Sequence, residues 1–334
     1  MRNWIARLFG GGEAVAPAAS AAPEAVPAAS IAEPAATQAP GTGPDFWRWL
    51  TAGAAATPTA PARAHAQLVL DELDRLIDNP HDAAGLVPRV PEVIPQLLRS
   101  LRDEAASSAD LARQVARDPA LVAELIREAN SPFYRSSSQV RTIDAALLVL
   151  GRNGLRMLLA RAAFRPLIGM QGGRHARQAA PRIWSHTEQC ALAASLLAPG
   201  LNADPFEAYL AGLMDDLGVI VALRLFDGVL EADALPQDPA FVAALLARTR
   251  TLSARIALQW ELPPPIAAAI LGAQGDGPSA AQPLARALGA AERVAVLRLL
   301  LDAGMLAHDD PALAGLGAEA ARAFERLAPA ERMS

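Results

Sequence analysis

Lysine is absent from this chain of 334 residues, so all 30 basic residues are arginine, which is typical of a GC-rich genome. Cysteine occurs once, at Cys190, which excludes an internal disulfide and a metal site built on several thiolates. Its apolar sequence neighbours predict a buried structural thiol. No apolar run reaches the roughly 18 residues that a transmembrane helix needs, and no secretory signal follows the first arginines. We therefore expect a cytoplasmic protein.

Aromatic residues make up only 4% of the chain, and β-branched runs are scarce. Alanine, leucine, arginine and glutamate dominate instead, and this composition favours helix over sheet. The net charge of −5 argues against a general nucleic-acid binder, which is usually basic. The sequence predicts an all-α protein with no nucleic-acid partner.

Composition divides the chain into four parts. Residues 1–62 form an Ala/Pro-rich segment that we expect to be a disordered tail, because repeated prolines break helices and alanine cannot build a core. A leading helix and linker should follow over 63–84, a helical domain over 85–275, and a helical extension over 276–334.

Prolines, capping residues and apolar spacing place the expected helices. The helical spacing of apolar residues is interrupted at Gly151 and Gly154. We expect helices at about 63–78, 92–102, 107–117, 119–129, 142–150, 154–168, 181–197, 205–214, 218–229, 239–247, 253–260, 264–271, 283–301 and 311–327.

The tail contains a short aromatic motif made of Phe46, Trp47, Trp49 and Leu50. Aromatic side chains in a disordered segment usually anchor it to something, because they offer a large apolar area at a small entropic cost. The anchor could contact a partner's groove, a membrane surface or this protein's own domain. We predict a tethered ligand that docks on its own domain, where an outside partner would have to displace it.

Several segments between residues 86 and 275 resemble the HDOD family, the HD-related output domains of bacteria. They read, in order, VPRVPEV from Val87, DPALV from Asp118, EANSPFY from Glu128, IWSH from Ile183, YLAGLMDDLG from Tyr209 and ALQWELP from Ala257. The resemblance implies a helical fold related to HD-type metal phosphohydrolases, which serves as an output or scaffold domain in bacterial signalling.

The resemblance also identifies a degenerate HD-type site. His186 lies where the first histidine of the enzymes falls, whereas the histidine–aspartate pair reads Asp215-Asp216. One imidazole and two carboxylates fall short of the ligand set that lowers the pKa of metal-bound water. We expect no catalysis, no cofactor and no resident metal. The alternative is a weak metal-dependent phosphodiesterase that uses these three residues.

A second alternative is a DNA-binding helix-turn-helix over residues 109–130. Two short amphipathic helices joined at Asp118-Pro119 fit its outline. The would-be recognition helix begins with Ala120-Leu-Val-Ala and offers little that could hydrogen-bond base edges.

The region 135–182 holds nine arginines and a single acid, Asp144. Guanidinium groups suit phosphates and acidic partner surfaces. The alternative is a solvated face that pairs with this protein's own acids. The candidate face for an anionic partner consists of Arg152, Arg156, Arg161, Arg165, Arg174 and Arg177.

Together these features predict a non-catalytic signalling module that acts through contacts with one or more signalling proteins of unknown identity.

Overall fold

The computed structural model describes residues 42–53, 60–79, 86, 119–130, 139–169, 173–229, 235–275 and 278–328. These residues form helices joined by turns, with no strand among them, which confirms the all-α class. The helices expected at 92–102 and 107–117 lie outside the described residues. No helix in the described ranges is long and apolar enough to cross a membrane.

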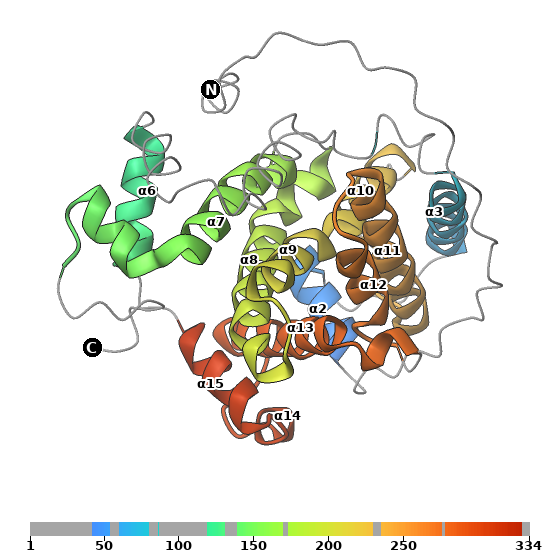
Figure 1. Ribbon diagram of the computed structural model, residues 1–334. Helices are drawn as coiled ribbons and strands as arrows, with labels where there is room; N and C mark the ends of the chain where they lie inside the picture. Colours follow the sequence, from blue (N-terminus) through green and yellow to red (C-terminus); the bar gives the residue numbers. More distant parts are fainter. Residues whose placement is uncertain are drawn as a thin grey trace, which may run out of the picture.

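Three helices form the centre of the domain (Figure 1). They are α8 (Arg174–Leu197), α9 (Pro205–Asp215) and α13 (Pro283–Asp302), and α8 packs against both of the others. At Gly212, α9 comes so close to α8 that an added Cβ would lie 2.6 Å from the Cα of Ala191. Glycine therefore sets the spacing of this helix pair.

A second group of helices packs beside this centre. It consists of α10 (Leu217–Val229), α11 (Pro239–Gln259) and α12 (Pro264–Gly272), with α3 (Ala60–Asp78) against α10 and α11. The side chain of Asp238 accepts a hydrogen bond from the backbone N–H of Phe241 and so caps α11, which begins with a proline.

Helices α6 (Pro119–Ala129) and α7 (Ile143–Gly169) extend to one side of the domain (Figure 1). Helix α7 is kinked at Gly151, whose φ of 61° favours glycine, so the predicted break is confirmed. The Asn130 side chain joins the two helices through two hydrogen bonds to the backbone of Val140.

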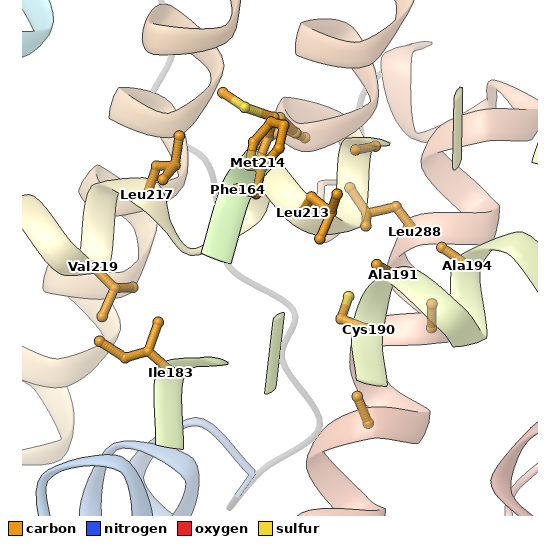
Figure 2. Close-up of a cluster of buried hydrophobic side chains, with 14 of the residues drawn as sticks. Phe164, Ile183, Cys190, Ala191, Ala194, Leu213, Met214, Leu217, Val219 and Leu288 are labelled. Atoms are coloured by element: carbon orange, nitrogen blue, oxygen red, sulfur yellow. The ribbon is translucent and has the colours of Figure 1, made fainter. Parts of the chain in front are cut away.

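One continuous core connects α7, α8, α9, α10 and α13 (Figure 2). Cys190 lies in it, fully buried, as the sequence predicts. Burial raises the pKa of its thiol well above the usual range, with nearby carboxylates adding to the shift. The thiol is therefore a packing group and not a nucleophile. Figure 2 also shows Phe164, Ile183, Leu213, Met214, Leu217, Val219 and Leu288 in this core.

Helix α8 begins at Arg174, seven residues earlier than predicted, and Pro181 lies inside it. The cause is a cap from another helix. Asp227 on α10 accepts hydrogen bonds from the backbone N–H groups of His175 and Ala176. A cap from so far along the chain leaves no local sequence pattern.

Two further boundaries differ from the prediction. The helices expected at 239–247 and 253–260 are one helix, α11, because no breaker separates them. The helix expected at 311–327 is two, α14 (Pro311–Ala314) and α15 (Ala318–Arg326), with Gly315 and Gly317 between them. Short 3-10 turns lie at Pro199–Leu201 and Pro278–Ala281.

The prediction of disorder over residues 1–62 is wrong at two places. Residues Thr42–Thr51 form helix α2, and α3 already begins at Ala60. Tertiary packing explains α2, because a helix of 10 residues is unstable in isolation. Residues 1–41 and 54–59 lie outside the described residues.

The close approach of α8 and α9 gives the first prediction. Gly212→Ala should lower the free energy of unfolding by about 1–3 kcal/mol, because the added methyl group meets backbone that cannot yield. Gly228→Ala in α10 is the matched control, since nothing lies within 4 Å of its added Cβ. It should be neutral or stabilise by about 0.5–1 kcal/mol. Urea denaturation of both variants tests this, and equal effects would contradict it.

Candidate functional site

The structure brings His186, Asp215 and Asp216 together at the point where α8 meets the junction of α9 and α10. His186 Nδ1 lies 2.8 Å from Asp216 Oδ2, and Thr187 Oγ1 donates a hydrogen bond of 2.6 Å to the same oxygen. All four side chains are buried. His186 Nδ1 and Asp216 Oδ2 are therefore paired, whereas His186 Nε2 has no hydrogen-bond partner among the described residues.

Asp215 faces a second charged pair that the sequence did not indicate. Arg250 of α11 donates a hydrogen bond of 2.5 Å to Glu292 of α13, and its Nε lies 3.9 Å from Asp215 Oδ1. Both residues are far from the HD-type motif in sequence, and each sits in an ordinary helical pattern. Only the packing of α11 and α13 against α9 places them at the site.

The backbone of the site is held by Ser253 of α11. Its hydroxyl donates to the Asp215 carbonyl at 2.7 Å and accepts from the Gly218 N–H at 2.8 Å. An added Cβ on Gly218 would lie 1.9 Å from the Thr249 carbonyl oxygen, so α10 begins directly against α11. The α9–α10 junction is thus fixed by hydrogen bonding and by close contact.

Burial dominates the electrostatics of the site. It raises the pKa of Asp215 to about 7, Glu292 and Asp216 add to the shift, and Arg250 and His186 oppose it. Burial alone would lower the pKa of His186, but its charge interaction and hydrogen bond with Asp216 outweigh that and raise it. The raised pKa of His186 favours the charged form of its imidazole ring.

Helix α2 lies directly over these residues. The ring of Phe46 is 4.5 Å from the His186 ring, centroid to centroid, at an interplanar angle of 50°. Phe46 and Gly43 line a cavity of about 300 Å³ whose floor includes His186, Asp215, Asp216, Arg250 and Glu292.

The tail motif is therefore an anchor to the protein's own domain. Trp47 is fully buried, and its indole N–H donates a hydrogen bond of 2.9 Å to the Pro236 carbonyl. The Gln237 side chain donates to the Thr51 hydroxyl at 3.1 Å. Leu50 is buried as well, whereas Trp49 is half-buried and stacks on Phe46. Figure 1 shows α2 within the domain, and it contacts α8, α11 and α13.

The residues of the site do not fit a catalytic metal. No group of three or more His, Cys, Asp or Glu side chains within the described ranges could hold an ion. Asp216 Oδ2 already accepts from Thr187 and contacts His186, and Asp215 faces a guanidinium group.

Arg161 is an internal structural partner, so the predicted face for an anionic partner is wrong at this residue. Its guanidinium group lies 2.7 Å from Glu128, 2.8 Å from Glu188 and 3.6 Å from Glu124. The side chain is only 17% exposed, because α6, α7 and α8 surround it. Two of these glutamates, Glu124 and Glu128, lie in the would-be recognition helix of the helix-turn-helix alternative.

The other five arginines are spread over different surroundings. Arg156 lies over the Phe206 ring at 4.1 Å, and Arg165 lies over Trp184 at 5.9 Å. Arg152 is half-buried, whereas Arg174 and Arg177 are exposed in the first turn of α8. Their contact with an anionic partner stays a prediction.

Comparison with known proteins assigns the chain to a family. The model of the HDOD domain matches residues 87–274, which is more than half of the chain. The chain belongs to the HDOD family. This confirms the resemblance to the HDOD family.

Two solved structures have folds similar to that of this chain. One is a candidate metal-dependent phosphohydrolase from Shewanella amazonensis SB2B, with a TM-score of 0.55, 16% identity and coverage of 79% of this chain and 98% of that one. The other is an HDOD domain protein of unknown function from Geobacter sulfurreducens, with a TM-score of 0.53, 20% identity and coverage of 76% and 89%. At these identities the likeness shows the fold alone. No match was found among curated protein sequences.

The environment of Arg161 gives the second prediction. Arg161→Gln should reduce the free energy of unfolding by about 3–5 kcal/mol, because three carboxylates then lose their shared cation. Arg165→Gln, on the exposed side of the same helix, should change it by no more than about 1 kcal/mol. Thermal and urea unfolding provide the measurement. Similar small losses in both variants would show that Arg161 belongs to a solvated face after all.

The raised pKa of Asp215 gives the third prediction. The folded state binds this proton more tightly than the unfolded state, so the carboxyl group increasingly favours unfolding as pH rises from about 4 to about 7. Asp215→Asn should therefore stabilise the protein by an amount that grows over this range and levels off above it, reaching a few kcal/mol at most. Urea denaturation at several pH values tests the variant, with exposed Asp309→Asn as the control. A gain that shrinks with rising pH would contradict the prediction.

Proposed function

We propose that this protein is a non-catalytic signalling module of the cytoplasm, in which helix α2 is an internal ligand that a partner protein displaces. The observation that carries the proposal is the position of Phe46 on the imidazole ring of His186. The tail thus occupies the surface above the HD-type centre, where the related enzymes would need access for a substrate.

The α2 contact has the features of an exchangeable peptide complex. Its anchors, Phe46, Trp47 and Leu50, lie on one side of a short helix, as in a helix bound to a groove. Residues 54–59 connect it to α3, and so short a connection gives a local concentration on the order of millimolar. A partner helix with a similar apolar pattern must compete with the tethered α2 at this local concentration. Only a partner that binds tightly enough would displace α2, so the protein would change between a docked and a displaced state.

The fourth prediction concerns exchange of α2. A labelled peptide of residues 41–53 should bind the full chain carrying Phe46→Ala and Trp47→Ala, in which the internal helix has lost its anchors. The same peptide should bind the unmodified chain at least about tenfold more weakly, because α2 already fills the groove. Fluorescence anisotropy measures both affinities.

A peptide with Trp47→Ala is the control and should bind neither chain, because it lacks the indole that donates to Pro236. Equal binding of the unaltered peptide to both chains would show that α2 does not occupy its site in solution. The proposal of an internal ligand would then fail.

The alternative function is a weak metal-dependent phosphohydrolase, which the description of the Shewanella amazonensis structure favours. The fifth prediction is the absence of this activity. With bis-p-nitrophenyl phosphate and Mn²⁺, Mg²⁺ or Ni²⁺, we expect no turnover above that of the Asp216→Ala variant, because Asp216 is bonded to His186 and Thr187. Turnover that disappears in a folded Asp216→Ala protein would establish the enzyme instead. The assay should be repeated with the variant that carries Phe46→Ala and Trp47→Ala. In this variant α2 has lost its anchors, so it cannot block a substrate from reaching His186 and Asp216.

A further inference from the structure

The hairpin of α7 and α8 carries positive charge that no acid within the same stretch of sequence balances. Residues 145–187 contain seven arginines and no aspartate or glutamate. Arg161 is paired with three glutamates. By contrast, the guanidinium groups of Arg165, Arg177 and Arg182 form no ion pair and no hydrogen bond with any described residue. Positive charge is therefore left over where the hairpin faces solvent.

Antiparallel packing of α7 and α8 brings two of these arginines to one tryptophan. Arg161 of α7 meets Glu188 of α8, and one turn further along α7 Arg165 lies over the Trp184 ring at 5.9 Å. Arg177 precedes Trp184 by about two helical turns, so both side chains project from the same side of α8. Arg165 and Arg177 are exposed, and Trp184 is half-buried. We call these three residues the basic–aromatic surface.

Stacking prepares Arg165 for an acidic ligand. The indole ring of Trp184 holds the guanidinium group in place without accepting hydrogen bonds from the N–H groups at its edge. A planar fork of such donors matches a carboxylate, which accepts two parallel hydrogen bonds. The indole also offers apolar area beside the charge, and tryptophan and arginine are enriched among the residues that contribute most to protein–protein binding.

The charge of the whole protein indicates the kind of partner. Because the net charge is −5, the rest of the molecule repels a nucleic acid or an anionic bilayer, whose negative charges extend well beyond this surface. A short acidic segment of a protein contacts the basic–aromatic surface alone. An apolar residue next to its carboxylates can also pack on Trp184.

We propose that the basic–aromatic surface binds an acidic segment of a partner protein, whose carboxylates pair with Arg165 and Arg177 and whose apolar side chain packs on Trp184. Trp184 and His186 are two residues apart, which is about 200° around the helix, so this surface and the α2 contact lie on opposite sides of α8. The surface therefore binds its partner whether or not α2 is docked, and the two proposals can fail separately.

A fluorescein-labelled peptide with glutamates on both sides of a central leucine tests the proposal on the full chain. Fluorescence anisotropy at low ionic strength should show saturable binding, and added salt should weaken it. The same peptide with glutamine in place of every glutamate should bind at least about tenfold more weakly, because its side chains are neutral. Binding should be unchanged in the chain that carries Phe46→Ala and Trp47→Ala, which tests the independence from α2.

Variants locate the bound peptide. The double variant Arg165→Gln, Arg177→Gln should bind it at least about tenfold more weakly, because it lacks both cations. Trp184→Leu should bind it severalfold more weakly, because leucine offers less apolar area. The double variant Arg255→Gln, Arg286→Gln is the matched control, since it removes the same charge from exposed positions of α11 and α13. It should change the affinity by less than about twofold, because exposed charges far from the surface are screened.

Four results would overturn the proposal. Absence of saturable peptide binding, or equal binding of the glutamine peptide, would show that the surface does not recognise carboxylates. Equal losses in the two double variants would show attraction by net charge alone. A large fall in melting temperature of the Arg165→Gln, Arg177→Gln variant would show that these arginines are structural partners. Tighter binding of a single-stranded oligonucleotide or of phosphatidylserine vesicles, lost in the same variant, would show a site for nucleic acid or for lipid.

Discussion

The hydrogen bond between His186 and Asp216 is the interaction on which the rest of the site depends. It joins α8 to the junction of α9 and α10 across 30 residues of sequence, inside a region closed to solvent. Asp216 Oδ2 contacts His186 Nδ1 and also accepts a hydrogen bond from Thr187, so this carboxylate ties two neighbouring residues of α8 to the junction. On its other side, the imidazole ring of His186 faces helix α2, where the ring of Phe46 lies 4.5 Å away.

Helix α2 packs over His186 and the segment before α11. Phe46 covers the imidazole ring, and Trp47 reaches past it to the backbone of the segment before α11. The two contacts differ in kind, because one is a ring contact with His186 and the other is a hydrogen bond to the Pro236 carbonyl group. Docking of α2 therefore does not depend on the His186 contact alone.

Much of this fold could be predicted from the sequence, and the rest could not for specific physical reasons. Prolines at Pro205 and Pro239 and the glycine at Gly151 act locally, so they located helix starts and a kink correctly. The order of the family motifs correctly predicted the HDOD family, whose model matches residues 87–274. By contrast, Arg250 and Glu292 reach the site only through packing of helices distant in sequence. Helix α2 was mistaken for disordered tail because its stability comes from tertiary contacts, although its apolar residues already showed the spacing of one helix face.

The central claim is that α2 is docked over the HD-type centre in the resting protein. Hydrogen exchange of the backbone amides of residues 46–51, followed by mass spectrometry on the full chain, tests it most directly. The account predicts exchange at least about a hundredfold slower than for an unstructured peptide, with the protection lost in Trp47→Ala. Exchange of these amides at the rate of an unstructured peptide, while those of α8 and α9 stay protected, would contradict the account.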